Sequence, residues 1–142
     1  MRKELYEALT RSLEGLGFKH FDLWNRQVEF LDEDAPFPTP ALFVEFGDIT
    51  WRELSGGSTF RGEGTVILHV VERFEGSAAT GAVNRDDVLA QLDWSARIQR
   101  ALLRLKGESF DGLRLTTTRT NHDHEDVIES IEVFNVKYDR SI

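Results

Sequence analysis

The first part of the chain carries leucines at helical spacing. Leu5, Leu9, Leu13 and Leu16 recur every three or four positions, and charged residues occupy many of the positions between them. This period brings the leucines onto one face of a helix and leaves the charges on the other. A glycine on each side of Leu16 ends the pattern, as glycines commonly do at helix C-termini. We therefore predict an amphipathic first helix.

The apolar pattern then changes to one that predicts strands. Residues 18–31 show it weakly, and we expect an extended, irregular strand there. Three prolines within five residues then lead into the strand ALFVEFGDITW, because each proline restricts its own φ and the residue before it. Alternate apolar side chains share one face up to Phe46, whereas Ile49 and Trp51 have the opposite parity. One extra residue would restore the common face, so we predict a β-bulge at Gly47.

A glycine-rich segment separates this strand from the next one. Residues 52–64 are mostly polar and contain four glycines. Such a segment buries little apolar surface, and its glycines make it costly to order. We predict a mobile loop that projects from the sheet. Phe60 stands among polar neighbours in this loop, and we expect its side chain to anchor the loop to a neighbouring subunit. The alternative is a loop tip that folds back over its own sheet.

The strand after this segment is apolar on both sides. Val66, Leu68 and Val70 form one face, and Ile67 and Val71 lie on the other. The final strand has a similar change of parity. Because solvent is a poor neighbour for a second apolar face, we predict a subunit interface there. The alternative is that some of these residues lie under a loop or remain exposed. The predicted interface residues are Trp51, Phe60, Ile67 and Val71.

The last third of the chain predicts a helix followed by a hairpin. Asp86 and Asp87 suit the N-terminus of a helix whose apolar stripe runs to Leu105 and which ends at Gly107. Two strands follow, joined by the turn NHDHED. The fold class that we predict is α+β, with a mainly antiparallel sheet and two helices packed on one of its faces.

Composition limits the function classes. A length of 142 residues predicts one domain, over 1–142. The net charge of −8 and the absence of a cluster of lysines and arginines in the sequence argue against wrapping DNA. The chain contains no cysteine, which excludes a disulfide framework and thiolate chemistry. The charged N-terminal residues predict neither a signal peptide nor a membrane-spanning helix.

Two histidines form the strongest candidate for metal chemistry. His122 and His124 lie beside carboxylates and offer donors that zinc accepts. All of these residues belong to one predicted turn, whereas metal ligands usually come from more than one element. We interpret the segment as a solvated polar turn, and we expect no metal site, no catalytic residues and no cofactor.

The order of these segments resembles phage and prophage tail proteins of the minor tail protein U-like, or tail-terminator, group. The likeness follows the run DLWNRQVEFLDEDAPFPTPALFVEF, then a tryptophan, a glycine-rich break, TVILHVVE, a helix and a terminal hairpin. It covers nearly the whole chain and is most specific from Asp22 to Phe46. The resemblance implies a ring, usually a hexamer, that caps the tail tube, stops its polymerisation and supports attachment of the head.

We therefore expect a structural assembly protein, not an enzyme, that is assembled in the host bacterial cytoplasm and belongs to the virion. Its expected partners are copies of itself, the tail-tube protein and the head-tail connector, with no membrane and no sequence-specific nucleic acid. A head-tail joining protein or another minor tail protein is the nearest alternative. A metal-dependent hydrolase using His122 and His124, or a small-ligand-binding α+β module, would belong to different classes.

Overall fold

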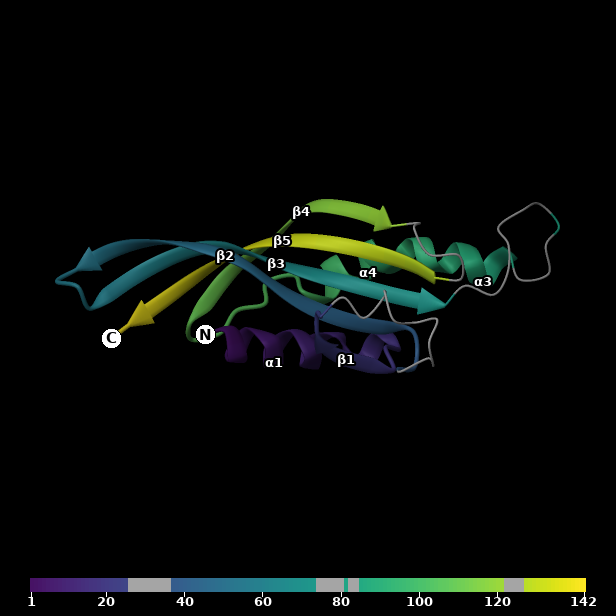
Figure 1. The fold of residues 1–142 in the computed structure, drawn as a ribbon, viewed down its shortest axis with the longest axis horizontal. Helices are drawn as coiled ribbons and strands as arrows, with labels where there is room; N and C mark the ends of the chain where they lie inside the picture. Colours follow the sequence, from purple (N-terminus) through teal and green to yellow (C-terminus); the bar gives the residue numbers. More distant parts are fainter. Residues whose placement is uncertain (26–36, 74–80, 82–84, 122–126) are drawn as a thin grey trace.

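A computed structural model describes residues 1–25, 37–73, 81, 85–121 and 127–142 (Figure 1). The N-terminal helix α1 is followed by a short 3-10 helix, η1, and by three strands. A broken helical segment and two further strands complete the chain. The elements are α1 (Arg2–Leu13), η1 (Glu14–Leu16), β1 (His20–Leu23), β2 (Ala41–Ser55), β3 (Thr59–Arg73), α3 (Arg85–Ala90), η3 (Gln91–Asp93), α4 (Trp94–Ala101), β4 (Phe110–Asn121) and β5 (Val127–Ser141).

The five strands form one mixed sheet in the order β1-β2-β3-β5-β4. Three of the four pairings are antiparallel, as predicted, but β1 pairs with β2 in parallel. Two parallel neighbours cannot be joined by a tight hairpin, so β1 and β2 are not a hairpin pair. The sheet is therefore mixed, and it is mainly antiparallel as predicted, with one parallel pairing at its β1 edge.

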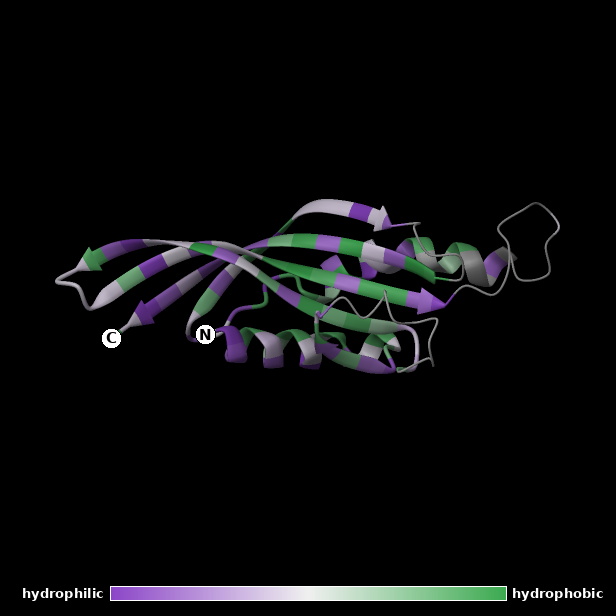
Figure 2. Cartoon of the chain, in the orientation of Figure 1, coloured by the Kyte–Doolittle hydropathy of each residue, from purple (hydrophilic) through white to green (hydrophobic). Residues whose placement is uncertain are grey.

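Both helical segments pack on the same face of the sheet, which we call the helix-covered face. Leu5, Leu9 and Leu13 of α1 are fully buried there, as is Ile98 of α4. They meet alternate residues of the central strands, as the strand period requires. The strand residues of this core include Leu42, Val44, Val66, Leu68, Val70, Phe134, Val136 and Tyr138. Hydrophobic stretches run through the parts of β3 and β5 beside the helices (Figure 2).

The predicted bulge is confirmed. The register between β2 and β3 shifts between Phe46 and Ile49, beside Gly47. After the shift, Phe46, Ile49 and Trp51 all pack against the core under the helices. A Cβ on Gly47 would collide with the Thr65 hydroxyl, so the bulge also needs a residue without a side chain. The bulge at Gly47 thus explains both the parity change in β2 and the close approach of Thr65 of β3.

The second helix differs from its prediction. Instead of one helix to Gly107, α3 and α4 are separated by η3, and the α-helix ends at Ala101. Leu102 and Leu105 continue to pack on the core from turns, in which Arg104 has a φ of 65°. The buried apolar positions therefore continue beyond the C-terminal end of the helix. Asp86 lies within the first turn of α3, which begins at Arg85, rather than before it.

Two further expectations fall outside the described residues. These are the continuation of the weak strand beyond residue 25 and the turn that holds His122 and His124. No helix in the described part of the chain is long and apolar enough to cross a membrane.

Candidate functional site

The predicted loop 52–64 is wrong, because most of this segment belongs to two paired strands. Residues 49–55 of β2 pair with 59–64 of β3, and β5 continues beside β3 to Ser141. The backbone N–H of Ile142 also donates to the carbonyl of Ser58 at 2.8 Å. We call these three strand ends, residues 49–64 and 138–142, the arm. Figure 1 shows the β2–β3 hairpin extending past the N-terminal end of α1.

The glycines have specific positions in the arm. Gly56 and Gly57 form its turn with φ values of 52° and 72°, a conformation that suits a tight hairpin turn and disfavours other residues. Gly62 lies opposite Trp51, and a Cβ there would come within 2.8 Å of the Trp51 ring. Gly64 lies close to the backbone at Asp48 in the same way. The glycines therefore permit a turn and close packing of side chains, not a mobile loop.

One side of the arm continues the helix-covered face of the sheet. The guanidinium of Arg140 lies 4.5 Å from the centre of the Trp51 ring, which also contacts Tyr138. Phe60 is half-buried and lies between its cross-strand neighbours Glu53 and Arg140. This side therefore presents an aromatic surface beyond the helices, with cationic and acidic groups at its border.

The opposite face of the sheet, which we call the open face, has a second small core. Phe37, Phe43 and Val71 are buried in it together with Val127. Val71 is fully buried in the single chain, so its side chain presents no surface to a partner in this conformation, and its interface role stays a prediction. The alternative of burial within the chain holds at this position, because the proline-led segment before β2 supplies Phe37.

Farther along the open face, the apolar side chains are only half-buried. Ile67 lies opposite Val133, and His69 lies opposite Ile131 in the next row. These three aliphatic side chains, Ile67, Ile131 and Val133, form the apolar stripe of the open face. Of the predicted interface residues, the structure thus places Trp51 and Phe60 on the arm and Ile67 on the open face, without bringing them into one cluster.

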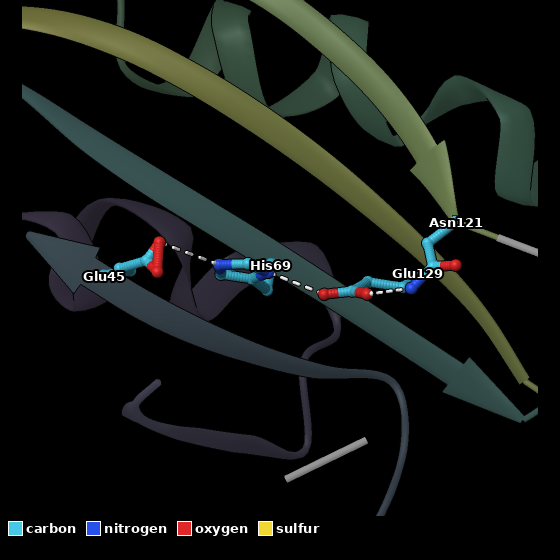
Figure 3. A network of polar contacts seen from close by, with 4 residues as sticks. All are labelled: Glu45, His69, Asn121 and Glu129. Atoms are coloured by element: carbon cyan, nitrogen blue, oxygen red, sulfur yellow. Dashed lines mark hydrogen bonds and ion pairs between the residues drawn. The ribbon is translucent and has the colours of Figure 1, made fainter. Parts of the chain in front are cut away.

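A buried polar network lies between the second core and the apolar stripe (Figure 3). Nδ1 of His69 is 2.6 Å from Oε2 of Glu129, and the Asn121 amide donates to Oε1 of the same carboxylate at 2.8 Å. Glu45 approaches the other ring nitrogen of His69 at 3.5 Å. The Trp24 ring stacks on the imidazole, with centres 3.8 Å apart. His69 and Glu129 are both almost fully buried.

This network connects neighbouring strands of the sheet. The pair joins β3 to β5, and Asn121 adds β4. A single histidine on an apolar strand does not by itself identify its partner in the sequence. The signal that identifies this partner is the strand parity that puts Glu129 on the open face. Among the described residues, no group of three or more histidines, aspartates and glutamates has an arrangement suited to a metal ion.

Glu132 is a second buried carboxyl, on the helix-covered face. Its side chain is fully buried, and burial raises its pKa above the usual value. The hydroxyls of Thr118 and Ser95 donate to Oε2 at 2.6 and 2.9 Å and act in the opposite direction. Oε1 has no hydrogen-bond partner among the described residues. The group links α4 to the β4–β5 hairpin.

Comparisons with known proteins give a fold and no family. No protein-family model matches the chain, and no curated protein is similar to it. Among solved structures, the chain is similar to one from the "Virion of native gene transfer agent (GTA) particle", with a TM-score of 0.55 and 14% sequence identity. The similarity covers 95% of this chain and 94% of the other. The two chains therefore share their fold over almost their whole lengths.

Proposed function

We propose that this protein is a structural component of a virion, and that its role is that of a tail terminator. The observation that carries the proposal is the fold shared from end to end with a chain of a gene transfer agent virion. The resemblance of the segment from Asp22 to Phe46 to tail terminators supports the finer role. The protein would act as an assembly factor, without catalysis or a cofactor, in a virion assembled inside a bacterial host.

The proposed mechanism is geometric. Each copy of the chain binds the next copy through one surface and the previous copy through a different surface. Such contacts continue from copy to copy until a ring closes. The apolar stripe of the open face supplies one surface, since its side chains are half-exposed in the single chain. The arm supplies another, because it extends past the helices. We propose a ring of six copies.

The ring has two unlike sides. One side matches the end of the tail tube and the other does not accept another tube subunit, so polymerisation stops there. The partners in this proposal are the tail-tube protein and the head-tail connector. A role as a head-tail joining protein is the second candidate, because the fold shared with a virion chain supports it equally.

Assembly with the tube tests the proposal. The purified chain is mixed with polymerising tail-tube protein from the same particle, and tube lengths and ends are recorded by electron microscopy. We expect tubes that stop growing and carry a six-fold ring at one end. Tubes that elongate as they do without the protein would contradict the terminator role. Binding to the head connector without binding to tubes would favour the joining role instead.

A pair of variants tests the ring surface. Ile67→Glu places a charge in the apolar stripe and should abolish the ring in sedimentation measurements, because burying an unpaired carboxylate is costly. The matched control is Leu92→Glu, at a side chain that is 72% exposed in η3. It makes a similar change away from the open face and should leave the ring intact. Loss of the ring in both variants, or in neither, would contradict the assignment of this surface.

A further inference from the structure

A band of positive charge lies at the base of the arm and runs from the open face to the start of the edge strand β4 and the turn after α4. Three adjoining surface hollows are lined there by residues of β2, β3, β4 and β5 and of the turn after α4, and Lys137 lines all three. We call the band the basic trough. Its cations are Arg52, Arg61, Arg104, Lys106, Arg114 and Lys137.

Most of these cations have no partner of opposite charge in the described part of the chain. Arg61 is the exception: its guanidinium lies 3.0 Å from Asp139 and 3.6 Å from Asp111. The acidic residues of the trough are Asp111, Asp139 and Glu63. Six cations and three acids give the trough a formal charge of +3. Since the whole chain carries −8, the remainder carries −11.

The basic trough continues directly into the apolar stripe. Along β3 and β5, the row of Glu63 and Lys137 is separated from the row of Ile67 and Val133 by one row on the same face, formed by Thr65 and Asn135. An apolar centre with a charged border is the usual composition of a protein interface. The two features together therefore describe one docking surface and not two unrelated patches.

We propose that the basic trough receives an acidic surface of a second copy of this chain. The inference rests on the proposed function, because it identifies one side of the contact that closes the ring. Opposite charges across an interface accelerate association and select the partner. A second copy meets this requirement, since its residues outside the trough carry a net charge of −11. Nucleic acid fits less well, because the chain as a whole carries −8 and repels a phosphate backbone.

The trough and its acidic counterpart are different parts of the same chain, so each copy can offer its trough to one neighbour and its acidic surface to the other. Two troughs facing each other would repel, which disfavours a two-fold symmetric dimer centred on the trough. The charges are therefore compatible with the head-to-tail arrangement that closes rings.

The test is to reverse charge in the trough. In the variant Arg52→Glu with Lys137→Glu, both changes lie at exposed side chains, and circular dichroism and thermal melting check that the fold is kept. Self-association measured by sedimentation should weaken at least about tenfold. The control is Lys3→Glu with Lys19→Glu, an equal charge change at exposed residues outside the trough, which should associate like the wild type.

The dependence of association on ionic strength is an independent test of the same inference. Raising ionic strength from about 0.1 M to about 1 M shortens the screening length from about 10 Å to about 3 Å and should weaken wild-type association about tenfold. Association unaffected by salt and by the trough variant would overturn the inference. So would a wild-type monomer that still terminates tails, which would leave the proposed function standing. Loss of binding to duplex DNA in the trough variant, with association unchanged, would assign the trough to nucleic acid instead.

Discussion

At the scale of single residues, two buried carboxyls hold the sheet in different ways. Glu129 meets a histidine and an amide, whereas Glu132 meets two hydroxyls and leaves one oxygen without a partner in the described part of the chain. Burial of a charge is costly unless it is paired. The first group should therefore contribute to stability mainly through its partner, and the second should respond to pH.

Substituting Glu132 tests the second point. Its folded-state pKa is raised, so the folded chain binds more protons than the unfolded chain between the two pKa values. Its contribution to stability is therefore full below the unfolded pKa and is lost as pH rises through the folded pKa. We expect Glu132→Gln to raise the free energy of unfolding at neutral pH by about 1 kcal/mol and to flatten its pH dependence.

Urea unfolding measured from about pH 4 to about pH 8 tests this prediction, because carboxyl groups with raised pKa values titrate in roughly this range. Glu63→Gln, at an exposed carboxyl of β3, is the control and should change neither stability nor its pH dependence. A Glu132→Gln variant that is less stable at neutral pH, with the pH dependence kept, would show that the two hydroxyl contacts outweigh the cost of burial.

The His69 and Glu129 pair gives a prediction of opposite sign. His69→Leu removes the histidine contact of the buried Glu129 carboxylate and should cost about 3 kcal/mol. The double variant His69→Leu with Glu129→Leu removes both partners and should be less destabilised than the sum of the single variants. A double-mutant cycle from denaturant unfolding measures the coupling. Additive losses would mean that the two side chains act independently.

At the scale of elements, the arm is an extension of the sheet, and its glycines are packing residues. Gly62→Ala would place a methyl group 2.7 to 2.8 Å from Ile49 and the Trp51 ring. Overpacking of this kind should lower the free energy of unfolding by about 1–3 kcal/mol. Gly15→Ala is the control, since nothing lies within 4 Å of a Cβ there and no loss is expected. Equal effects in thermal melts would show that the arm does not constrain Gly62.

The arm also explains where the sequence prediction of a loop failed. Four glycines among polar residues are typical of a loop, and each residue taken alone favours one. The segment forms strands because Gly62 lets Trp51 and Ile49 pack across it, and because β5 pairs with β3 as far as Ser141. A contact between residues so distant in sequence is not visible in local composition. The bulge at Gly47, by contrast, follows from parity within one strand and was predicted.

At the scale of the whole molecule, the arm lies beyond the helices and presents Phe60. Phe60→Ser should lower the melting temperature only slightly, since the side chain is half-exposed in the single chain. Under the proposed function, completion of tails of uniform length should nevertheless fail in a complementation assay. Ile142→Ser, at an 84% exposed side chain at the end of the arm, is the control and should complete tails. Tails of normal length with Phe60→Ser would show that Phe60 is not needed for the contacts that complete the tail.

The features that could be predicted from the sequence are those that depend on residues near one another in the chain. These are the first helix, the bulge, the alternation that makes β3 apolar on both sides, and the final hairpin, because periodicity of 3.6 or 2 reports local geometry directly. Tertiary structure produced the parallel pairing of β1, the burial of Val71 in one core with Phe37 and the contact of His69 with Glu129. It also gathered Arg52, Arg104 and Lys137 into one trough, although no cluster of cations exists in the sequence. Each of these depends on which strands become neighbours, and that choice is made by packing between distant segments.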